Sequence, residues 1–229
     1  MLLALGLGTA ALAACGDSEE STETASPSAQ PPSSTSTTPP RPVYDVSHVD
    51  SIKDDFPAGF TTDAHPAKAL AQQDIDNSGI IPFTQAQFDP PQCRALVIPP
   101  YTEPTVDTQA AGVRGTGDQG EIHVVALRLP KPVPVTPPPA GCDQVSMSGA
   151  PEASGSAQPI PAPQIEGVTT TGAQLNPADE EEDPDYMFTA ALDDQTSVIV
   201  MGSTQAELNP QQVMSDLLVK ATAAVRGSG

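Results

Sequence analysis

The stretch 186-YMFTAALDDQTSVIVMGSTQAELNPQQVMSDLLVKATAAVRG-227 decides the fold of this chain. It begins with two apolar runs, residues 186–192 and 197–202, which the polar residues 193–196 separate. Two short apolar runs joined by a polar turn are typical of a β-hairpin. We therefore predict two antiparallel strands here.

An amphipathic helix is predicted directly after this hairpin. Asn209 suits the N-cap, Pro210 the first helical position and Gly227 the stop. A helix laid over one face of a mainly antiparallel sheet gives an α+β domain, and the neighbouring hairpin is the natural partner. The apolar side chains that recur at helical spacing and must pack on that partner are Val213, Met214, Leu217, Leu218, Ala221, Ala224 and Val225.

The rest of the domain has weaker signals. Residues 121–129 are rich in Val, Leu and Ile at consecutive positions, which favours a strand covered on both faces. Before it we predict a short helix and an extended piece over 44–63, a short helix over 65–70, and a short helix over 88–99 that Asp89 caps. After it we predict a short strand over 142–147, a loop over 149–163, an exposed strand over 165–175 and an acidic loop over 179–185.

The first fourteen residues are an uncharged run of mainly Leu, Ala and Gly. This length suits a secretory signal peptide and is too short to span a bilayer as a helix. Residues 12–15, Leu-Ala-Ala-Cys, resemble the lipobox of bacterial lipoproteins, although no Lys or Arg precedes the apolar run. The resemblance implies that Cys15 is lipidated and tethers the chain to the extracytoplasmic face of the cell membrane. The alternative is a buried helix with a chance cysteine.

Composition divides the chain into three parts. Residues 1–14 are the expected signal peptide, and residues 15–43 are the lipidated linker, rich in Ser, Thr and Pro. Such a segment buries too little apolar surface to fold, so we expect it to be disordered, with an r.m.s. reach of roughly 30 Å. Residues 44–229 are expected to form a single α+β domain.

Charge excludes some partners. The chain has 29 acidic against nine basic residues and a formal net charge of -20. Nucleic acids and anionic lipid surfaces are bound by basic patches, so we expect no nucleic-acid partner. The lipid anchor is the predicted contact with the membrane, and an envelope protein or a small ligand is the other expected partner.

Two cysteines lie within the predicted domain. If Cys15 carries lipid, Cys93 and Cys142 form one even pair in an oxidising compartment, and we predict a disulfide between them. The alternative is a pair of free thiols. No C-x-x-C motif is present, so a thioredoxin-like redox role has no support.

Motifs for cofactors or metals are incomplete. Gly115, Gly117 and Gly120 spell G-x-G-x-x-G, but a predicted strand follows where a dinucleotide site needs a helix, so we interpret them as a glycine turn. Residues 74–79 match the opening of a calcium loop, yet Gln85 stands where the closing Glu belongs. We therefore expect no cofactor and no metal.

Glu121 and His123 lie on the same face of their predicted strand, and Asp118 precedes it. This set suits acid/base or metal chemistry, while polar side chains on an exposed strand face are the simpler interpretation. The acidic run 179–183 is read as a solvated loop, with a cation or basic-partner site as the alternative.

A family resemblance lies in residues 140–143, 189–203 and 211–226. These segments resemble mycobacterial lipoproteins of unknown function and, more distantly, the extracellular sensor domain of the mycobacterial serine/threonine kinase PknH. The resemblance implies a sheet with helices on one side and a role in binding or signalling. That kinase domain has two disulfides, whereas this chain offers one cysteine pair.

Taken together, these patterns predict a non-catalytic, lipid-anchored cell-envelope protein with a sensor-like domain that binds a ligand or a protein. We expect no enzymatic activity and assign no catalytic residue. One alternative is an envelope hydrolase of unrecognised type that uses His123 and a nearby carboxylate. Another is a purely structural surface lipoprotein.

Overall fold

A computed structural model describes residues 42–150, 153–179 and 181–227, and Pro42–Gly229 form one compact unit. The predicted signal peptide, the lipidated Cys15 and most of the predicted linker lie outside the described residues. Within the described ranges, no helix is both long enough and apolar enough to cross a membrane.

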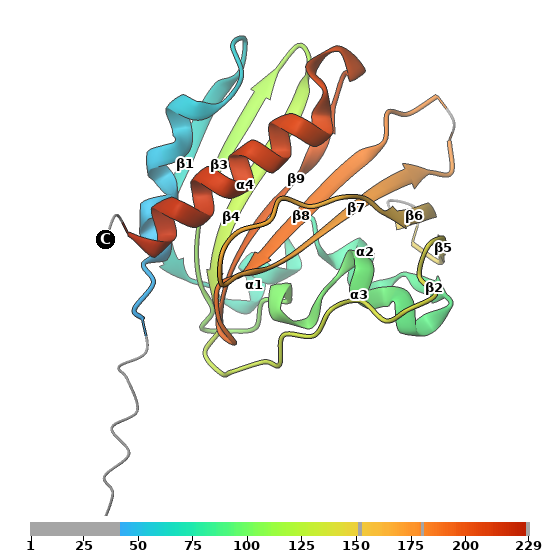
Figure 1. Cartoon of the computed structure of the whole chain (residues 1–229), viewed down its shortest axis with the longest axis horizontal. Coiled ribbons are helices and arrows are strands. Elements are labelled where there is room, and N and C mark those ends of the chain that lie inside the picture. Colours follow the sequence, from blue (N-terminus) through green and yellow to red (C-terminus); the bar gives the residue numbers. More distant parts are fainter. Residues whose placement is uncertain (1–41, 151–152, 180, 228–229) are drawn as a thin grey trace, which may run out of the picture. The chain divides into compact units, whose positions relative to one another are not determined.

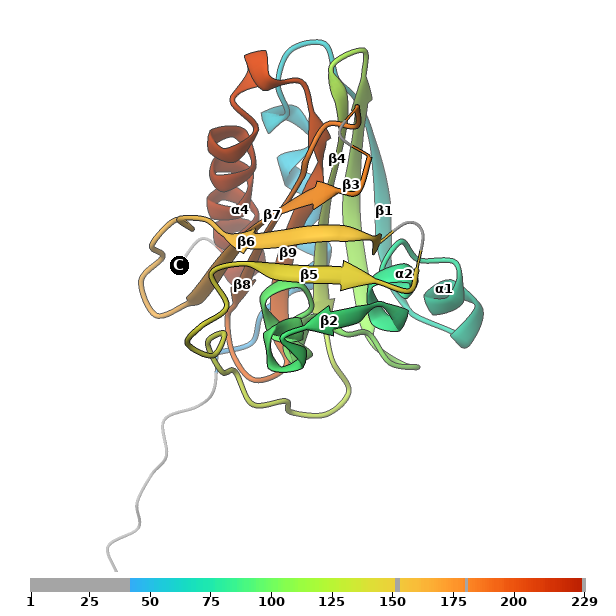
Figure 2. The same cartoon turned by 90° about the vertical axis from the view of Figure 1, so that its right-hand side faces the viewer.

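A nine-stranded sheet organises the domain, in the order β1-β3-β4-β9-β8-β7-β6-β5-β2 (Figure 1). Every neighbouring pair is antiparallel. Figure 2 shows β6, β5 and β2 lying beside one another across the domain. The strands are β1 Thr61–Ala69, β2 Gln87–Asp89, β3 Gln109–Gly117, β4 Gly120–Arg128, β5 Val145–Ser148, β6 Gly155–Pro159, β7 Thr169–Pro177, β8 Asp185–Ala191 and β9 Thr196–Thr204.

Helices cover parts of both faces of this sheet. The long C-terminal helix α4 lies on one face, where it packs against β4, β8, β9 and the 3₁₀-helix η1 (Figure 1). The short helices α2, η2 and α3 supply side chains to the core on the other face. The helices are η1 Val46–Asp55, α1 Gln72–Asp76, α2 Ile81–Gln85, η2 Pro91–Cys93, α3 Arg94–Val97, η3 Pro100–Thr102, η5 Ala206–Leu208 and α4 Pro210–Arg226.

The predicted C-terminal hairpin is confirmed. Strands β8 and β9 pair with Met187 opposite Met201, and a polar turn joins them. Asp193 makes this turn, because its side chain accepts hydrogen bonds from the backbone N–H groups of Gln195 and Thr196 at 2.9 and 2.6 Å. An Asp that bonds backbone groups two and three residues ahead is a common turn former.

The predicted helix over the sheet is also confirmed, and so is the α+β class. Its apolar stripe is buried, with Met214, Leu217 and Leu218 at 0, 1 and 0% exposure. The predicted cap is wrong in detail. Asn209 adopts a left-handed conformation at φ 53° and its side chain makes no cap hydrogen bond. The reason is that Asn209 also closes η5, with its N–H bonded to the carbonyl of Ala206 at 3.0 Å.

Two hydrophobic cores lie on opposite faces of the sheet, because successive side chains of a strand point to opposite sides. Phe188 packs under α4, while its neighbour Met187 belongs to the other core. Strand β4 supplies Val124 to the first core and Leu127 to the second. The predicted strand over 121–129 is confirmed as an interior strand of the sheet, with one face buried and the other covered at Leu127 but open at Glu121 and His123.

The predicted disulfide is present in the second core. Cys93 at the end of η2 bonds to Cys142, which precedes β5, with 5.4 Å between their Cα atoms. Both cysteines are buried, at 0 and 5% exposure. The bond therefore ties the short helices η2 and α3 to the part of the sheet formed by β5, β6 and β7.

Tyr101 joins η3 to the sheet through buried hydroxyl groups. Its hydroxyl lies 3.0 Å from that of Thr189, which in turn lies 2.6 Å from that of Thr171. Burial raises the pKa of Tyr101, and the hydrogen bonds from the two threonines act in the opposite direction. These bonds satisfy polar groups that would otherwise be costly to bury.

Several predictions between residues 61 and 163 are wrong. Residues 65–70 are not helical: 65–69 belong to β1, which pairs along β3 with a bulge between His65 and Lys68 that holds Pro66. Strand β3 was not predicted. Asp89 does not cap a helix, because it belongs to β2 and pairs with Ser146. A short helical segment carrying Cys93 does follow, as η2 and α3.

Strand β6 corrects two further predictions. It lies within residues 149–163, which were expected to be a loop. Because β6 pairs with β7, the strand predicted over 165–175 is an interior strand rather than an exposed one. Its residues Ala173 and Leu175 are 1 and 4% exposed.

Candidate binding site

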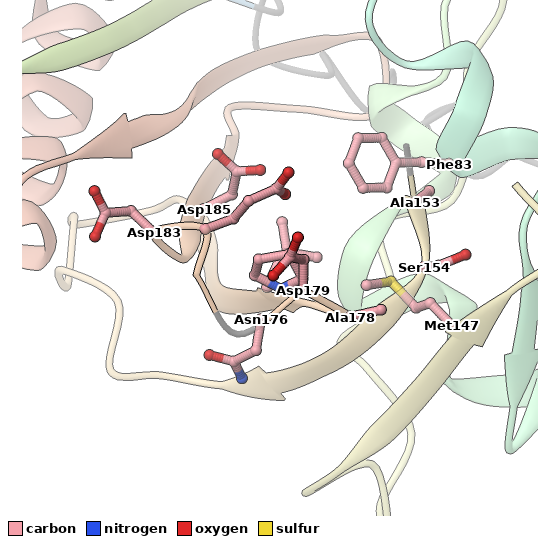
Figure 3. A pocket seen from close by; sticks show the side chains of 12 residues that line it. Phe83, Met147, Ala153, Ser154, Asn176, Ala178, Asp179, Asp183 and Asp185 are labelled. Atoms are coloured by element: carbon pink, nitrogen blue, oxygen red, sulfur yellow. The ribbon is translucent and has the colours of Figure 1, made fainter. Parts of the chain in front are cut away.

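A hollow of about 510 Å³ lies where β7 ends and β8 begins. Its lining comes from α2, β5, the start of β6, the end of β7 and the acidic segment that leads into β8 (Figure 3). Segments far apart in the sequence therefore build one cavity, and its size falls within the range of small-molecule sites.

The two sides of this pocket differ in chemistry. Phe83 and Met147 lie on one side, and Asp183 and Asp185 lie on the other (Figure 3). Leu175 adds apolar surface, and Asp179 and Glu182 add carboxylates. An apolar wall that faces negative charge is complementary to a molecule with a cationic group and a hydrocarbon part.

Asp185 is the carboxylate of this pocket whose pKa is clearly shifted. Burial raises its pKa above the ordinary value of 3.8, and the neighbouring charge of Glu182 raises it further. Both causes disfavour the ionised form. A cation bound beside Asp185 would favour the ionised carboxylate and so oppose both effects on its pKa.

A second hollow, of about 410 Å³, lies beside the first at the β3–β4 turn and the end of β9. Asp183 lines both hollows, and Asp118 and Glu121 line the second. Asp118 is in the turn and belongs to this hollow rather than to a set with His123. The same end of the sheet therefore presents carboxylates from several loops.

The glycine motif forms the turn beside this second hollow. Gly117 pairs with Gly120 at the end of the β3–β4 hairpin, and a strand follows, as predicted. Gly120 has φ 128°, and a Cβ there would lie 2.2 Å from the carbonyl oxygen of Ser203. The glycine is thus required by backbone conformation and close strand packing, and the motif is followed by β4 rather than by the helix that a dinucleotide site needs.

His123 and Glu121 are brought together on the open face of β4. The imidazole contacts the carboxylate directly, and Arg114 on β3 binds the same carboxylate through two hydrogen bonds of 2.8 Å. The Arg114 hydrogen bond is the main cause that lowers the pKa of Glu121. In the described ranges no Ser, Thr or Cys side chain is hydrogen-bonded to His123.

The calcium-like segment is built differently from a calcium loop. Asp74 lies within α1, where Lys68 binds one of its oxygens at 2.5 Å and the backbone N–H of Ala71 binds the other at 2.9 Å. Asp76 accepts a hydrogen bond from Gln72 at 2.8 Å. Among the residues that the structure describes, no group of three His, Cys, Asp or Glu side chains is placed to hold a metal ion.

The acidic run was visible in the sequence, but the pocket was not. Residues 179 and 181–183 form an exposed loop, as predicted. Sequence analysis missed the apolar side of the pocket, because no sequence pattern marks Phe83 or Met147 as binding residues. Only the pairing of β5 with β6, in a segment expected to be a loop, brings Met147 to this end of β7.

Comparison with known proteins gives a family and a fold. The family described as Domain of unknown function (DUF5642) matches residues 45–226. A crystal structure of an uncharacterized protein from Mycobacterium smegmatis, described as an Rv0999 ortholog, is similar with a TM-score of 0.59 and 21% identity. The match covers 81% of this chain and 99% of that one, and at this identity it shows the fold alone. No curated protein matches the chain significantly.

Proposed function

The chain belongs to the family described as Domain of unknown function (DUF5642), and from that premise we propose that it is a non-catalytic, lipid-anchored cell-envelope protein. Its domain acts as a sensor-like binding module on the extracytoplasmic face of the membrane. The ligand is a small molecule, or the side chain of a protein, that carries a cationic group next to a hydrocarbon part.

The pocket beside Asp185 carries this proposal. It combines carboxylates with the apolar side chains of Phe83, Met147 and Leu175 in one hollow of about 510 Å³. A few polar groups at the edge of an apolar cavity commonly fix the orientation of a ligand. Here the charged groups select a cation, and the apolar wall selects its hydrocarbon part.

The anchor and compartment follow from the first part of the sequence. The apolar run before Cys15 supports export and lipidation, and the flexible linker over 15–43 lets the domain move within its reach of the membrane. The resemblance to the PknH sensor domain supports a signalling role for binding. The disulfide between Cys93 and Cys142 supports an oxidising compartment.

Binding of hexylamine, a cation with a short hydrocarbon chain, tests the pocket. We expect the methyl NMR signal of Met147 to shift saturably as hexylamine is added, while that of Met214 in the core under α4 does not. Affinity should rise as the pH rises through the raised pKa of Asp185, because only the ionised carboxylate attracts the cation.

Three controls define the outcome. Hexanol has the same chain without the charge and should bind much more weakly. Asp185→Asn should weaken hexylamine binding, whereas Asp107→Asn, at the other end of β3 from this pocket, should not. Equal binding of hexanol and hexylamine, or unchanged binding by Asp185→Asn, would contradict the proposed ligand class.

A hydrolase remains the second candidate because His123 contacts Glu121. An acid/base pair of this kind occurs in many hydrolases. Two features weigh against it: Arg114 already holds the carboxylate, and the His123 side chain is 40% exposed on an open strand face. Labelling by broad active-site probes that disappears in His123→Ala would favour the hydrolase, and absence of labelling by all of them would count against it.

A further inference from the structure

Two of the three large apolar side chains that are exposed in the described ranges, Val43 and Val106, lie at the end of the domain opposite the acidic pocket. Three large apolar side chains are exposed in the described ranges: Val43 at 81%, Val106 at 45% and Val219 at 41%. Val106 lines a groove of about 740 Å³ together with Leu129, Val133 and the prolines of the segment after β4. We call Val43, Val106, Pro130, Pro132 and Val133 the tether-end surface.

Contacts place Val43 beside this groove. The carbonyl of Tyr44 accepts a hydrogen bond of 3.5 Å from Arg128, the residue before Leu129. The Tyr44 hydroxyl reaches the carbonyl of Leu192, and the backbone N–H of Leu129 bonds to the carbonyl of Gln195 at 2.8 Å. Residues 42–44, the proline segment and the β8–β9 turn therefore form one end of the domain.

This end is also where the rest of the chain joins. Residues 1–41 precede Pro42, so any anchor at Cys15 reaches the domain through Val43. Strand β8 runs from Asp185 at the acidic pocket to Ala191 near this end. Its seven residues span roughly 20 Å at the usual rise of a strand.

The two ends differ in charge as well as in polarity. Of the two hollows that share Asp183, one is lined by four carboxylates and the other by three, and among the described residues neither is lined by a Lys or Arg. The tether end carries both signs, since Arg128 and Lys131 lie there together with Glu103, Asp107, Asp193 and Asp194. A surface of lipid phosphates would therefore repel the acidic end more strongly than the tether end.

We propose that the tether-end surface rests on the lipid bilayer in which the chain is anchored, so that the acidic pocket opens away from the membrane. This inference rests on the lipid anchor of the proposed function. The patch is too small to bind a bilayer by itself. A tether raises its effective concentration at the membrane, so a weak apolar contact is enough to populate the seated orientation.

The absence of tryptophan from the sequence makes this testable by fluorescence. The lipidated full chain carrying Val106→Trp is reconstituted in phosphatidylcholine vesicles, with and without lipids brominated near the headgroup end of the acyl chains. We expect bromolipids to quench its emission. The matched control is Val219→Trp on α4, which replaces a valine of similar exposure and should keep its emission.

Val43→Trp is a second reporter that can be used if Val106→Trp does not fold. Val43 is the most exposed of the three valines, so a larger side chain there should disturb the fold least. Flotation of the chain with the vesicles tests the anchor separately. A chain that floats but shows no quenching at residues 43 and 106, or equal quenching at 219, overturns the seating and leaves the anchor intact. If the tryptophan emission shifts to the blue as the protein concentration rises in the absence of lipid, a second copy of the chain covers the surface, and the proposed seating on the bilayer is wrong. A chain that does not float refutes the anchor, and the seating with it.

Discussion

Replacing both cysteines, Cys93→Ala with Cys142→Ala, is expected to lower the free energy of unfolding by about 4 kcal/mol in the chain-entropy model. The bond closes a long loop, with a sequence separation of 49 between its cysteines, so opening it restores much freedom to the unfolded chain. It also releases η2 and α3, which pack in the second core. Urea denaturation of the oxidised parent and the variant measures the difference.

The reductant provides the matched control for this experiment. Reduced parent protein should be destabilised to nearly the same extent as the double variant, and the variant itself should not respond to reductant. A difference below about 1 kcal/mol between oxidised parent and variant would contradict the role of the bond, because the expected effect is several times larger.

Leu218→Ala is expected to destabilise the domain by about 2–5 kcal/mol, the usual cost of removing a buried leucine side chain. Leu218 is 0% exposed and lies in the core between α4 and the sheet. Its neighbour Val219 is 41% exposed, so Val219→Ala should change the free energy of unfolding by about 0.5 kcal/mol or less.

These adjacent residues test the packing of α4 with little change in helix propensity. Equilibrium denaturation of the two variants under one condition is the measurement. Similar losses for Leu218→Ala and Val219→Ala would contradict the arrangement, since they would mean that the helix does not present one face to the sheet.

The elements that could be predicted are those whose local pattern agrees with their place in the fold. Strand β4 has consecutive apolar residues over Val124–Leu127, where side chains of both faces reach a core, and α4 has a helical stripe because only one of its faces is covered. The turn at Asp193 and the cysteine pair also follow from local chemistry. In these segments sequence and tertiary structure indicate the same state.

Strands β1 and β3 could not be predicted because their composition is not typical of strands. Strand β3 contains Gly112 and Gly115, which weaken the strand signal but are needed for packing. A Cβ on Gly115 would lie 2.3 Å from the Phe56 ring, and one on Gly112 would lie 2.8 Å from the carbonyl oxygen of Val124. Strand β1 contains the helix formers Ala67, Lys68 and Ala69, yet pairing with β3 overrides that preference.

The acidic side of the candidate site could be predicted from the sequence, but its apolar side could not. The carboxylates form a run in the sequence, whereas Phe83 and Met147 reach the same hollow from α2 and β5 through pairing of strands that composition obscured. The contact of His123 with Glu121 followed from the period of a strand. The bidentate hold of Arg114 on the same carboxylate did not, because β3 itself was missed.

Mass spectrometry of the natively expressed protein, intact and then after non-reducing digestion, tests the central claim most directly. A tethered, disulfide-closed binding domain predicts a chain that starts at Cys15 with the added mass of a lipid, and a crosslinked peptide that joins Cys93 to Cys142. An unmodified chain that retains residues 1–14 and has free thiols would contradict the anchor, the compartment and the function proposed from them.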